Sequence, residues 1–413
     1  MDIYILIIAI LVIAGIVIRP FRLSEAVWAM TGAVLLVVLG LLPFKNALMG
    51  IKKGTDVYLF LAGMMLLAET ARGEKLFDWL AACATKAAKG SSKRLFLLIF
   101  IVGILVTSFL SNDATAVVMT PAVAAAAKTA KSKNPLSYLL ICAFVANAAS
   151  FILPISNPAN LVIYNGRMPP LPAWITIYGL PAVVAVVLTC FLLYLTQRKK
   201  MTEAIERDIA VPSLTYGGSI ALIGIGATMI VLLICSALDV PLGLPTAVTG
   251  IITSLVVLML SKKNPLMIIK AVSWSIIPFV AGLFVIVEAL DRTGLTGLIG
   301  QWLHHQSDIS AGMAAWSSGI IIAFGSNILN NLPAGLIAAN AVQAAHIPEI
   351  VRSAVLIGVD LGPNLSVTGS LATILWLVAL RREGLSVNGW TFLKTGVVVM
   401  IPALILTLLI LWI

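Results

Sequence analysis

Charged residues are scarce in this sequence of 413 residues. Only 11% of the residues are charged, whereas 60% are hydrophobic, and an ordinary soluble domain has about 25% charged residues. The chain therefore lacks the polar side chains needed to cover a water-facing surface. This excludes a soluble enzyme, a nucleic-acid-binding protein and a disordered scaffold, and it predicts an all-α protein that crosses a membrane several times.

Motifs for covalent or metal chemistry are also missing. The four cysteines stand singly, without a CxxC pair, and the three histidines have no metal-ligand spacing. Neither a nucleotide-binding loop nor a nucleophile motif is present. We therefore expect no catalytic residue, no metal and no cofactor. Any process that needs energy would therefore draw on an ion gradient or on a separate subunit.

Ten apolar segments are long enough to cross roughly 30 Å of hydrocarbon. The first has neither the basic n-region nor the cleavage site of a signal peptide, so we interpret it as a span. The ten predicted spans lie at about 3–18, 24–42, 57–71, 136–163, 172–195, 216–236, 243–260, 273–290, 350–380 and 391–412.

Two further apolar segments, 94–127 and 310–345, are interrupted midway by tracts that contain asparagine. The tracts read SFLSNDATAVVMTP and NILNNLPAGLIAAN. Asn and Asp side chains compete with the helix for backbone hydrogen bonds, and Pro333 has no backbone donor. We therefore predict that each segment is a re-entrant hairpin, which enters the membrane, turns, and leaves on the same side.

The basic residues support this topology. With the N-terminus and the C-terminus outside, 21 of the 27 Lys and Arg residues fall in loops on the inner side and 6 fall outside. Cytoplasmic loops of membrane proteins carry such an excess of Lys and Arg. If either hairpin were a full span, the topology after it would invert and the excess would be lost.

An internal repeat relates the two halves of the chain. The residues 60–63 with Glu69 recur as 279–282 with Glu288, at an offset of 219, and Asn112-Asp113 recurs as Asn330-Asn331, at an offset of 218. The two hairpins open to opposite sides in the predicted topology, so the repeats are inverted, as in many secondary transporters. The predicted segments are a first span (1–23), a first repeat (24–196), a polar cytoplasmic linker (197–215), a linking span (216–242) and a second repeat (243–413).

Two more polar tracts interrupt predicted spans, at 154–160 (PISNPAN) and 360–370 (DLGPNLSVTGS). Pro and Gly among Ser, Thr and Asn predict helices that unwind in mid-membrane, where only protein or a water-filled cavity can cover the backbone. With the two hairpin tips, these tracts would form a polar chamber for a polar solute. For any single Asn, capping a broken helix is the alternative role. The predicted lining is Ser111, Asn112, Asp113, Asn157, Asn330, Asn331 and Thr368.

Asp113 is the leading candidate for coupling transport to an ion. A carboxylate at the membrane centre costs about 2.5–3.5 kcal/mol on insertion scales, so we predict that Asp113 binds and releases a proton or pairs with a cation. The alternative is a carboxylate fixed by neighbouring amides. Asp360 is a second proton-coupling candidate, with helix capping as its alternative, and we expect Glu69 and Glu288 to brace the structure.

These motifs resemble those of the ion transporter superfamily. Ser111-Asn112-Asp113 is similar to the Ser-Asn-Thr-like motif at the hairpin tips of that superfamily. The run GVDLGPNLSVTGSLATILW (358–376), with Asn330-Asn331 and Pro333, is similar to bacterial arsenite efflux permeases of the ArsB type. The resemblance covers essentially the whole chain. The sequence departs from those permeases at Asn147, where they often have an acid, and at Val367-Thr368, where they often have proline.

The resemblance implies efflux of arsenite and antimonite from a bacterial cell through its inner membrane, coupled to protons, with elevator-type movement. It also implies an optional partnership with a cytoplasmic arsenite-stimulated ATPase subunit and, by analogy with the superfamily, a second copy of the chain in a homodimer. At neutral pH, arsenite is chiefly an uncharged trihydroxide, which amides and hydroxyls could bind through hydrogen bonds. Capture by thiols is an alternative, for which Cys142 is the one candidate. A sodium/proton antiporter of the same superfamily remains the main rival function. A citrate carrier is disfavoured because no Arg or Lys is predicted near the chamber, and the hairpins argue against an uncoupled channel.

Overall fold

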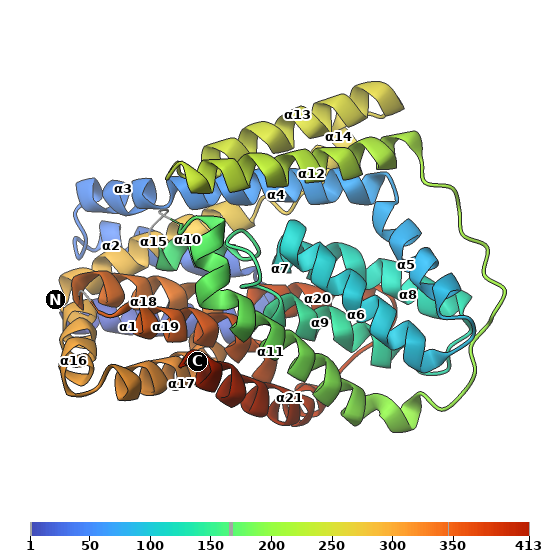
Figure 1. Ribbon diagram of the computed structural model, residues 1–413. Coiled ribbons are helices and arrows are strands. Elements are labelled where there is room, and N and C mark those ends of the chain that lie inside the picture. The colour runs from blue at the N-terminus through green and yellow to red at the C-terminus, as the bar shows by residue number, and fades with distance from the viewer. Residues whose placement is uncertain (1, 165–167, 346, 413) are drawn as a thin grey trace.

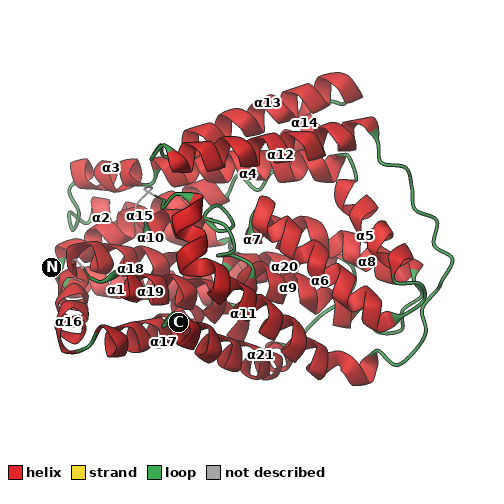
Figure 2. Cartoon of the chain, in the orientation of Figure 1, coloured by secondary structure: helices red, strands yellow, loops and turns green. Residues whose placement is uncertain are grey.

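The computed structural model describes residues 2–164, 168–345 and 347–412. Residues 1, 165–167, 346 and 413, which fall within the predicted segments, lie outside the described residues. The described chain consists of helices and loops and has no β-strand (Figure 2). The predicted all-α class is therefore confirmed.

The helices of the first half are α1 (Asp2–Ile18), α2 (Glu25–Val38), α3 (Phe44–Lys53), α4 (Thr55–Gly73), α5 (Leu76–Ala87), α6 (Ser92–Phe109), α7 (Asn112–Ala114), α8 (Thr120–Thr129), α9 (Leu136–Ala148), α10 (Pro158–Ile163) and α11 (Leu171–Gln197). A π-helical turn, Thr115–Met119, joins α7 to α8. The helices of the second half are α12 (Tyr216–Ala237), α13 (Gly243–Ser261), α14 (Pro265–Ala271), α15 (Ile276–Arg292), α16 (Leu295–Ile309), α17 (Ala311–Leu329), α18 (Asn331–Ala345), α19 (Glu349–Leu361), α20 (Leu371–Arg382) and α21 (Gly389–Ile410).

Within the described chain, seven helical segments are long and apolar enough to cross a membrane. They include α11, α12, α13 and α21, and the first helix of each predicted hairpin, α6 and α17. Large apolar side chains on these helices face outward, and Ile223 and Met259 are 70% and 77% exposed. Such an apolar outer surface suits contact with lipid rather than water. The predicted polytopic membrane fold is thereby confirmed.

The order of the helices in the second half repeats the order in the first. Helices α1 to α6 correspond to α12 to α17, hairpin helix α8 to α18, and α9, α10 and α11 to α19, α20 and α21. This correspondence extends to α1 and α12, which the sequence analysis left outside the repeats. In Figure 1, α5, α6 and α8 lie at the right-hand end of the molecule, whereas α16, α17 and α18 lie at the left.

Glycines allow the long helices of the two repeats to pack closely. Helix α4 packs along α13, and the equivalent helix α15 packs along α2. A Cβ atom at Gly63 would overlap the backbone carbonyl of Thr246, and one at Gly282 would lie 2.7 Å from the backbone of Ala29. These glycines belong to the repeated motifs at 60–63 and 279–282, so close packing of α4 and α15 explains why both motifs end in glycine.

The linker between the two halves is fastened to the base of the first hairpin. The backbone N–H of Ile205 donates to the carbonyl of Gly90, just before α6, and the N–H of Glu206 donates to the carbonyl of Ala130, just after α8. Both ends of the segment 92–129 therefore meet neighbouring residues of the linker. The chain enters and leaves this hairpin at one end of the molecule.

Candidate substrate site

The two hairpin tips have equivalent backbone geometry. The first residue of each tip has a positive φ, 146° at Ser111 and 73° at Asn330. The following N–H groups bind a carbonyl of the broken helix in the same repeat: Asn112 N–H donates to Ser156 at 3.0 Å, and Asn331 N–H donates to Gly369 at 2.8 Å. Each tip is thus held by an unwound segment.

This geometry corrects the register of the repeat by one residue. Ser111 is equivalent to Asn330 and Asn112 to Asn331, an offset of 219. The sequence comparison had paired Asp113 with Asn331, because it matched residue types. The structure pairs Asp113 with Leu332, so the second repeat has an apolar residue where the first has its acid.

The two predicted broken helices are present. Helix α9 ends at Ala148 and α10 begins at Pro158, while α19 ends at Leu361 and a 3-10 turn and an extended segment precede α20. Asn157 caps α10 by accepting from Ala159 N–H. Asn330 likewise accepts from Leu332 N–H, while its Nδ2 donates to the Thr368 carbonyl. Helix capping, the alternative weighed for these side chains, therefore uses part of their hydrogen-bonding capacity.

Side chains of the broken helices cross between the two repeats. Asn157 Nδ2 donates to Asp360 Oδ1 at 2.6 Å, and Asn147 Nδ2 donates to Asn364 Oδ1 at 3.1 Å and to Thr373 Oγ1 at 3.2 Å. Asp360 and Asn147 are completely buried. The remaining oxygen of each, Asp360 Oδ2 and Asn147 Oδ1, has no hydrogen-bond partner in the described chain. Because burying an unpaired acceptor is costly, a proton or an external donor would stabilise this centre.

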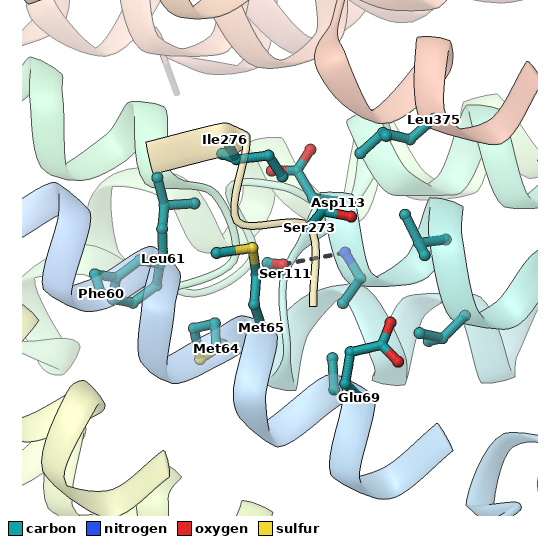
Figure 3. Close-up of a pocket in the computed structure, with 14 residues that line it drawn as sticks. Phe60, Leu61, Met64, Met65, Glu69, Ser111, Asp113, Ser273, Ile276 and Leu375 are labelled. Carbon is teal, nitrogen blue, oxygen red and sulfur yellow. Dashed lines mark hydrogen bonds between the residues drawn. The ribbon is translucent and has the colours of Figure 1, made fainter. Parts of the chain in front are cut away.

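Asp113 lies on a cavity rather than in the packed centre. Figure 3 shows its side chain among residues of α4 and of the segment that leads into α15. In the described chain, its carboxylate has neither an ion pair nor a hydrogen bond. The lining of the cavity includes Phe60, Met64 and Glu69 of α4, Ser111 of the tip, Ser273, and Leu375 of α20.

The repeat relates this cavity to a second one, which lies near the start of α4 and the end of α15. The second cavity is lined by Val57, Val162, Phe284, Glu288 and Leu336. Their equivalents, in the same order, line the first cavity: Ile276, Leu375, Met65, Glu69 and Val117. The first cavity reaches the hairpin tip at Ser111, whereas the second meets its hairpin at Leu336 and beyond and does not include Asn330 or Asn331.

The two cavities differ in charge. Lys53 and Asp56 line the second cavity, and Lys53 pairs with Glu288 at 2.6 Å. No Lys or Arg is among the described residues that line the first cavity, whose Glu69 pairs with Arg72 at 2.6 Å. The acidic residue Asp113 therefore faces a largely apolar space without a resident cation.

The other predicted site residues lie around these features. Of the seven predicted lining residues, Ser111 and Asp113 reach the first cavity, and Asn112, Asn157, Asn330 and Asn331 are buried at the tips and the broken helices. Thr368 is partly exposed, and its Oγ1 donates to the Asn327 carbonyl. Cys142 is buried in an apolar cluster and does not line either cavity.

Sequence reasoning missed several residues of this region. Asn327 accepts from Ser366 and donates to the Gly362 carbonyl, which ties α17 to the second unwound segment. Its place one turn before the tip, in the tract NILNN, was the available signal. Ser273 and the α4 face with Met64 gave no signal, because their residue types are ordinary in a membrane span.

Known proteins are similar to this chain in sequence and in fold. The citrate transporter family, CitMHS, matches residues 4–358. The chain belongs to the citrate transporter family. This transporter is also 26% identical over 343 residues to the arsenical pump membrane proteins of Escherichia coli K12 and of Yersinia enterocolitica, which covers 80% of this chain and 80% of each relative. The resemblance to arsenite permeases within the ion transporter superfamily is confirmed.

A solved structure shares the fold. The transporter is similar to the crystal structure of the YdaH transporter of Alcanivorax borkumensis, with a TM-score of 0.55, 13% sequence identity, and coverage of 89% of this chain and 86% of that one. At this identity the likeness concerns the fold alone. Together, the family and the fold establish a multi-pass membrane transporter and not an enzyme.

Proposed function

We propose that the transporter exports arsenite and antimonite, as neutral trihydroxides, in exchange for protons. The observation that carries the proposal is Asp113, a carboxylate at a hairpin tip with no hydrogen-bond or ionic partner among the described residues, on a cavity with no Lys or Arg in its described lining. The names of the arsenical pump relatives suggest the substrate. Ser111, Asn112, Asn157, Asn330, Asn331 and Thr368 are the proposed substrate-binding residues, and Asp113 and Asp360 the proposed proton-coupling residues.

The charge of the cavity favours a neutral substrate over citrate. A citrate ion would need cationic partners, since buried charges are stable only when they are paired. The first cavity offers a carboxylate instead, and the lysine of the second cavity is already paired with Glu288. A trihydroxide carries no charge, and its three hydroxyl groups donate as well as accept. Its hydroxyl groups can thus donate hydrogen bonds to the unpaired oxygens of Asp360 and Asn147 when the space between the broken helices opens.

The energy of one proton suffices for useful accumulation. Exchange of one neutral substrate for one proton moves one charge, which is worth about 2.3 kcal/mol per 100 mV. That energy corresponds to about 50-fold accumulation for each 100 mV, before any contribution of the pH gradient. The transporter therefore does not require ATP, although an ATPase subunit could add to this drive.

The two equivalent cavities suggest how access alternates. Each lies between a long helix of the α4 and α15 pair and the hairpin of the same repeat. We infer that the hairpins are re-entrant and that they move with the broken helices past α4 and α15, in the manner of an elevator. The first cavity reaches its tip and the second does not, so the state described is open on the side of the linker, which we assign to the cytoplasm.

Growth of a sensitive strain tests the proposed substrate. A bacterial strain without its own arsenite efflux system, expressing this transporter, should tolerate arsenite and antimonite without any change in sodium tolerance. The matched control is the same strain expressing Asp113→Asn. A gain in sodium tolerance without arsenite tolerance would favour the sodium/proton antiporter, and growth on citrate would favour a citrate carrier.

A further inference from the structure

A groove with cations at one end and apolar side chains along its length lies on the outer surface between α6 and α11. Lys93 and Arg94, in the first turn of α6, line one end of it, and Leu97, Val187 and Phe191 line the rest. The volume of this open groove, including space shared with its surroundings, is about 930 Å³. Phe96 and Tyr194 form its floor, with their rings edge to face at 5.9 Å between centroids.

The position of the groove matches one leaflet of a membrane. Both α6 and α11 are long and apolar enough to cross a membrane. The cations stand where α6 begins, beside the linker, because Ser92 Oγ bonds to the Glu203 carbonyl. From Tyr194 to Val187 the groove follows seven residues of α11, which is about 10 Å along the helix. It thus runs from the end of the transmembrane helices into their apolar part.

The two cations are available for an external anion. Lys93 and Arg94 are exposed, and no acidic residue of the described chain pairs with either of them. The start of α6 adds the positive end of a helix dipole. Two other apolar surface grooves, beside Trp302 and beside Met30, have no charged residue in their lining.

The repeat shows that the fold itself does not require these cations. The residues of α17 equivalent to Lys93 and Arg94 are Gly312 and Met313. A Cβ atom at Gly312 would lie 2.8 Å from the ring of Trp412, so an aromatic ring closes the equivalent position. The charged groove is therefore a feature of the linker side alone, where the basic loops also lie.

We propose that this groove binds one anionic phospholipid. The phosphate of the headgroup is held by Lys93 and Arg94, and an acyl chain lies against Leu97, Phe191 and Val187. Basic pockets between transmembrane helices on the cytoplasmic side are suited to anionic headgroups, and here the apolar groove continues directly from the cations. The bound lipid contacts α6, the first helix of the hairpin that carries Asp113. This inference does not depend on the substrate proposed above.

Lipid retention by the intact protein tests the proposal. The full chain, purified in detergent, is mixed with phosphatidylglycerol or with phosphatidylcholine of the same acyl chains, and retained lipid is counted by native mass spectrometry. We expect one phosphatidylglycerol per chain, in preference to phosphatidylcholine. The double variant K93Q/R94Q should bind phosphatidylglycerol about 30-fold more weakly.

Two further variants separate this site from general attraction to a basic surface. K86Q/K89Q removes the same charge from the end of α5 and the turn that follows it and should retain the lipid, whereas Val187→Trp fills the groove and should displace it with both cations intact. Equal melting temperatures would show that all variants are folded. Equal retention of the two lipids, unchanged binding by K93Q/R94Q, unchanged binding by Val187→Trp, or an equal loss in K86Q/K89Q would each overturn the proposal.

Discussion

Asn157 Nδ2 donates a hydrogen bond of 2.6 Å to Asp360 Oδ1, and this bond joins the broken helix of the first repeat to that of the second. Asp360 is equivalent to Asn147, whose Nδ2 also donates from the first repeat to the second, to Asn364 and Thr373. The two repeats are therefore joined at their centre by three hydrogen bonds that the first repeat donates to the second. The remaining oxygens of Asp360 and Asn147 are the unpaired acceptors at this centre.

The bond between Asn157 and Asp360 should contribute measurably to stability. Asn157→Ala removes both the cap of α10 and the donor to the carboxylate, whereas the control Asn388→Ala removes only the exposed cap of α21. A lost cap costs about 1 kcal/mol, and a hydrogen bond to a charged group contributes about 1.5–3 kcal/mol. Unfolding in detergent should show the larger loss of free energy for Asn157→Ala, and equal losses would contradict a structural role for the pair.

Close packing of α4 against α13 predicts that two glycine-to-alanine substitutions change the free energy of unfolding by very different amounts. A Cβ at Gly63 would overlap the carbonyl of Thr246, whereas a Cβ at Gly226 of α12 meets nothing within 4 Å. Gly63→Ala should therefore lower the free energy of unfolding by about 1–3 kcal/mol. Gly226→Ala should leave it unchanged or raise it slightly, because alanine favours the helix. Thermal unfolding of both purified variants checks the prediction, and a stable Gly63→Ala protein would refute the packing argument.

The linker should stay bound to Gly90 and Ala130 without the ion pair between Lys131 and Glu206. A hydrogen bond from Lys131 and the charge of Lys131 lower the pKa of Glu206. The pair therefore stabilises the folded state above the ordinary pKa of Glu and is lost as the pH falls through the lowered value. Because this pair lies at the surface, with 78% of the Lys131 side chain and 36% of the Glu206 side chain exposed, we expect this contribution to be small at any pH.

Hydrogen exchange of the Ile205 amide tests this expectation. That amide bonds to the Gly90 carbonyl, so its protection at pH 7 should be the same in Glu206→Gln and in the native protein. The control is Ser92→Ala, which removes the side-chain bond to the Glu203 carbonyl and should reduce the protection. If Glu206→Gln alone abolishes it, the ion pair and not the backbone holds the linker.

Recognition of the substrate by hydrogen bonds predicts that cysteines are dispensable. Cys142 is buried among apolar side chains, and the four cysteines are unpaired. A variant with alanine at positions 83, 142, 190 and 235 should therefore confer the same arsenite tolerance as the native transporter at equal expression. Loss of tolerance on replacing Cys142 alone, with the other three changes tolerated, would favour capture by a thiol.

The sequence predicted those features that depend on local backbone chemistry. The breaks near Ser111, Asn157, Asn330 and Gly362 follow from Asn, Pro and Gly in apolar segments, and the structure has a helix end at each of them. Matching residue types between the repeats gave a register that is wrong by one residue. Asn112 and Asn330 are the same residue type, but Ser111 is the residue that has the same backbone geometry as Asn330.

Features that depend on tertiary packing were beyond sequence reasoning. The cavity faces of α4 and α15 contain Phe60, Met64 and Phe284, which are ordinary residues of membrane spans. The docking of the linker on Gly90 and Ala130 uses backbone groups, which have no sequence signal. The roles of Asp113 and the other site residues remain predictions that transport measurements must test.

The most direct test of proton coupling by Asp113 is arsenite uptake into everted membrane vesicles under an imposed pH gradient. We predict that the native transporter accumulates arsenite when the vesicle interior is acidic. Asp113→Asn should lose this accumulation while still binding arsenite in equilibrium dialysis, and Asp308→Asn, at an exposed acid that lines neither cavity, should behave as the native protein. Accumulation driven by the pH gradient in Asp113→Asn would contradict the account.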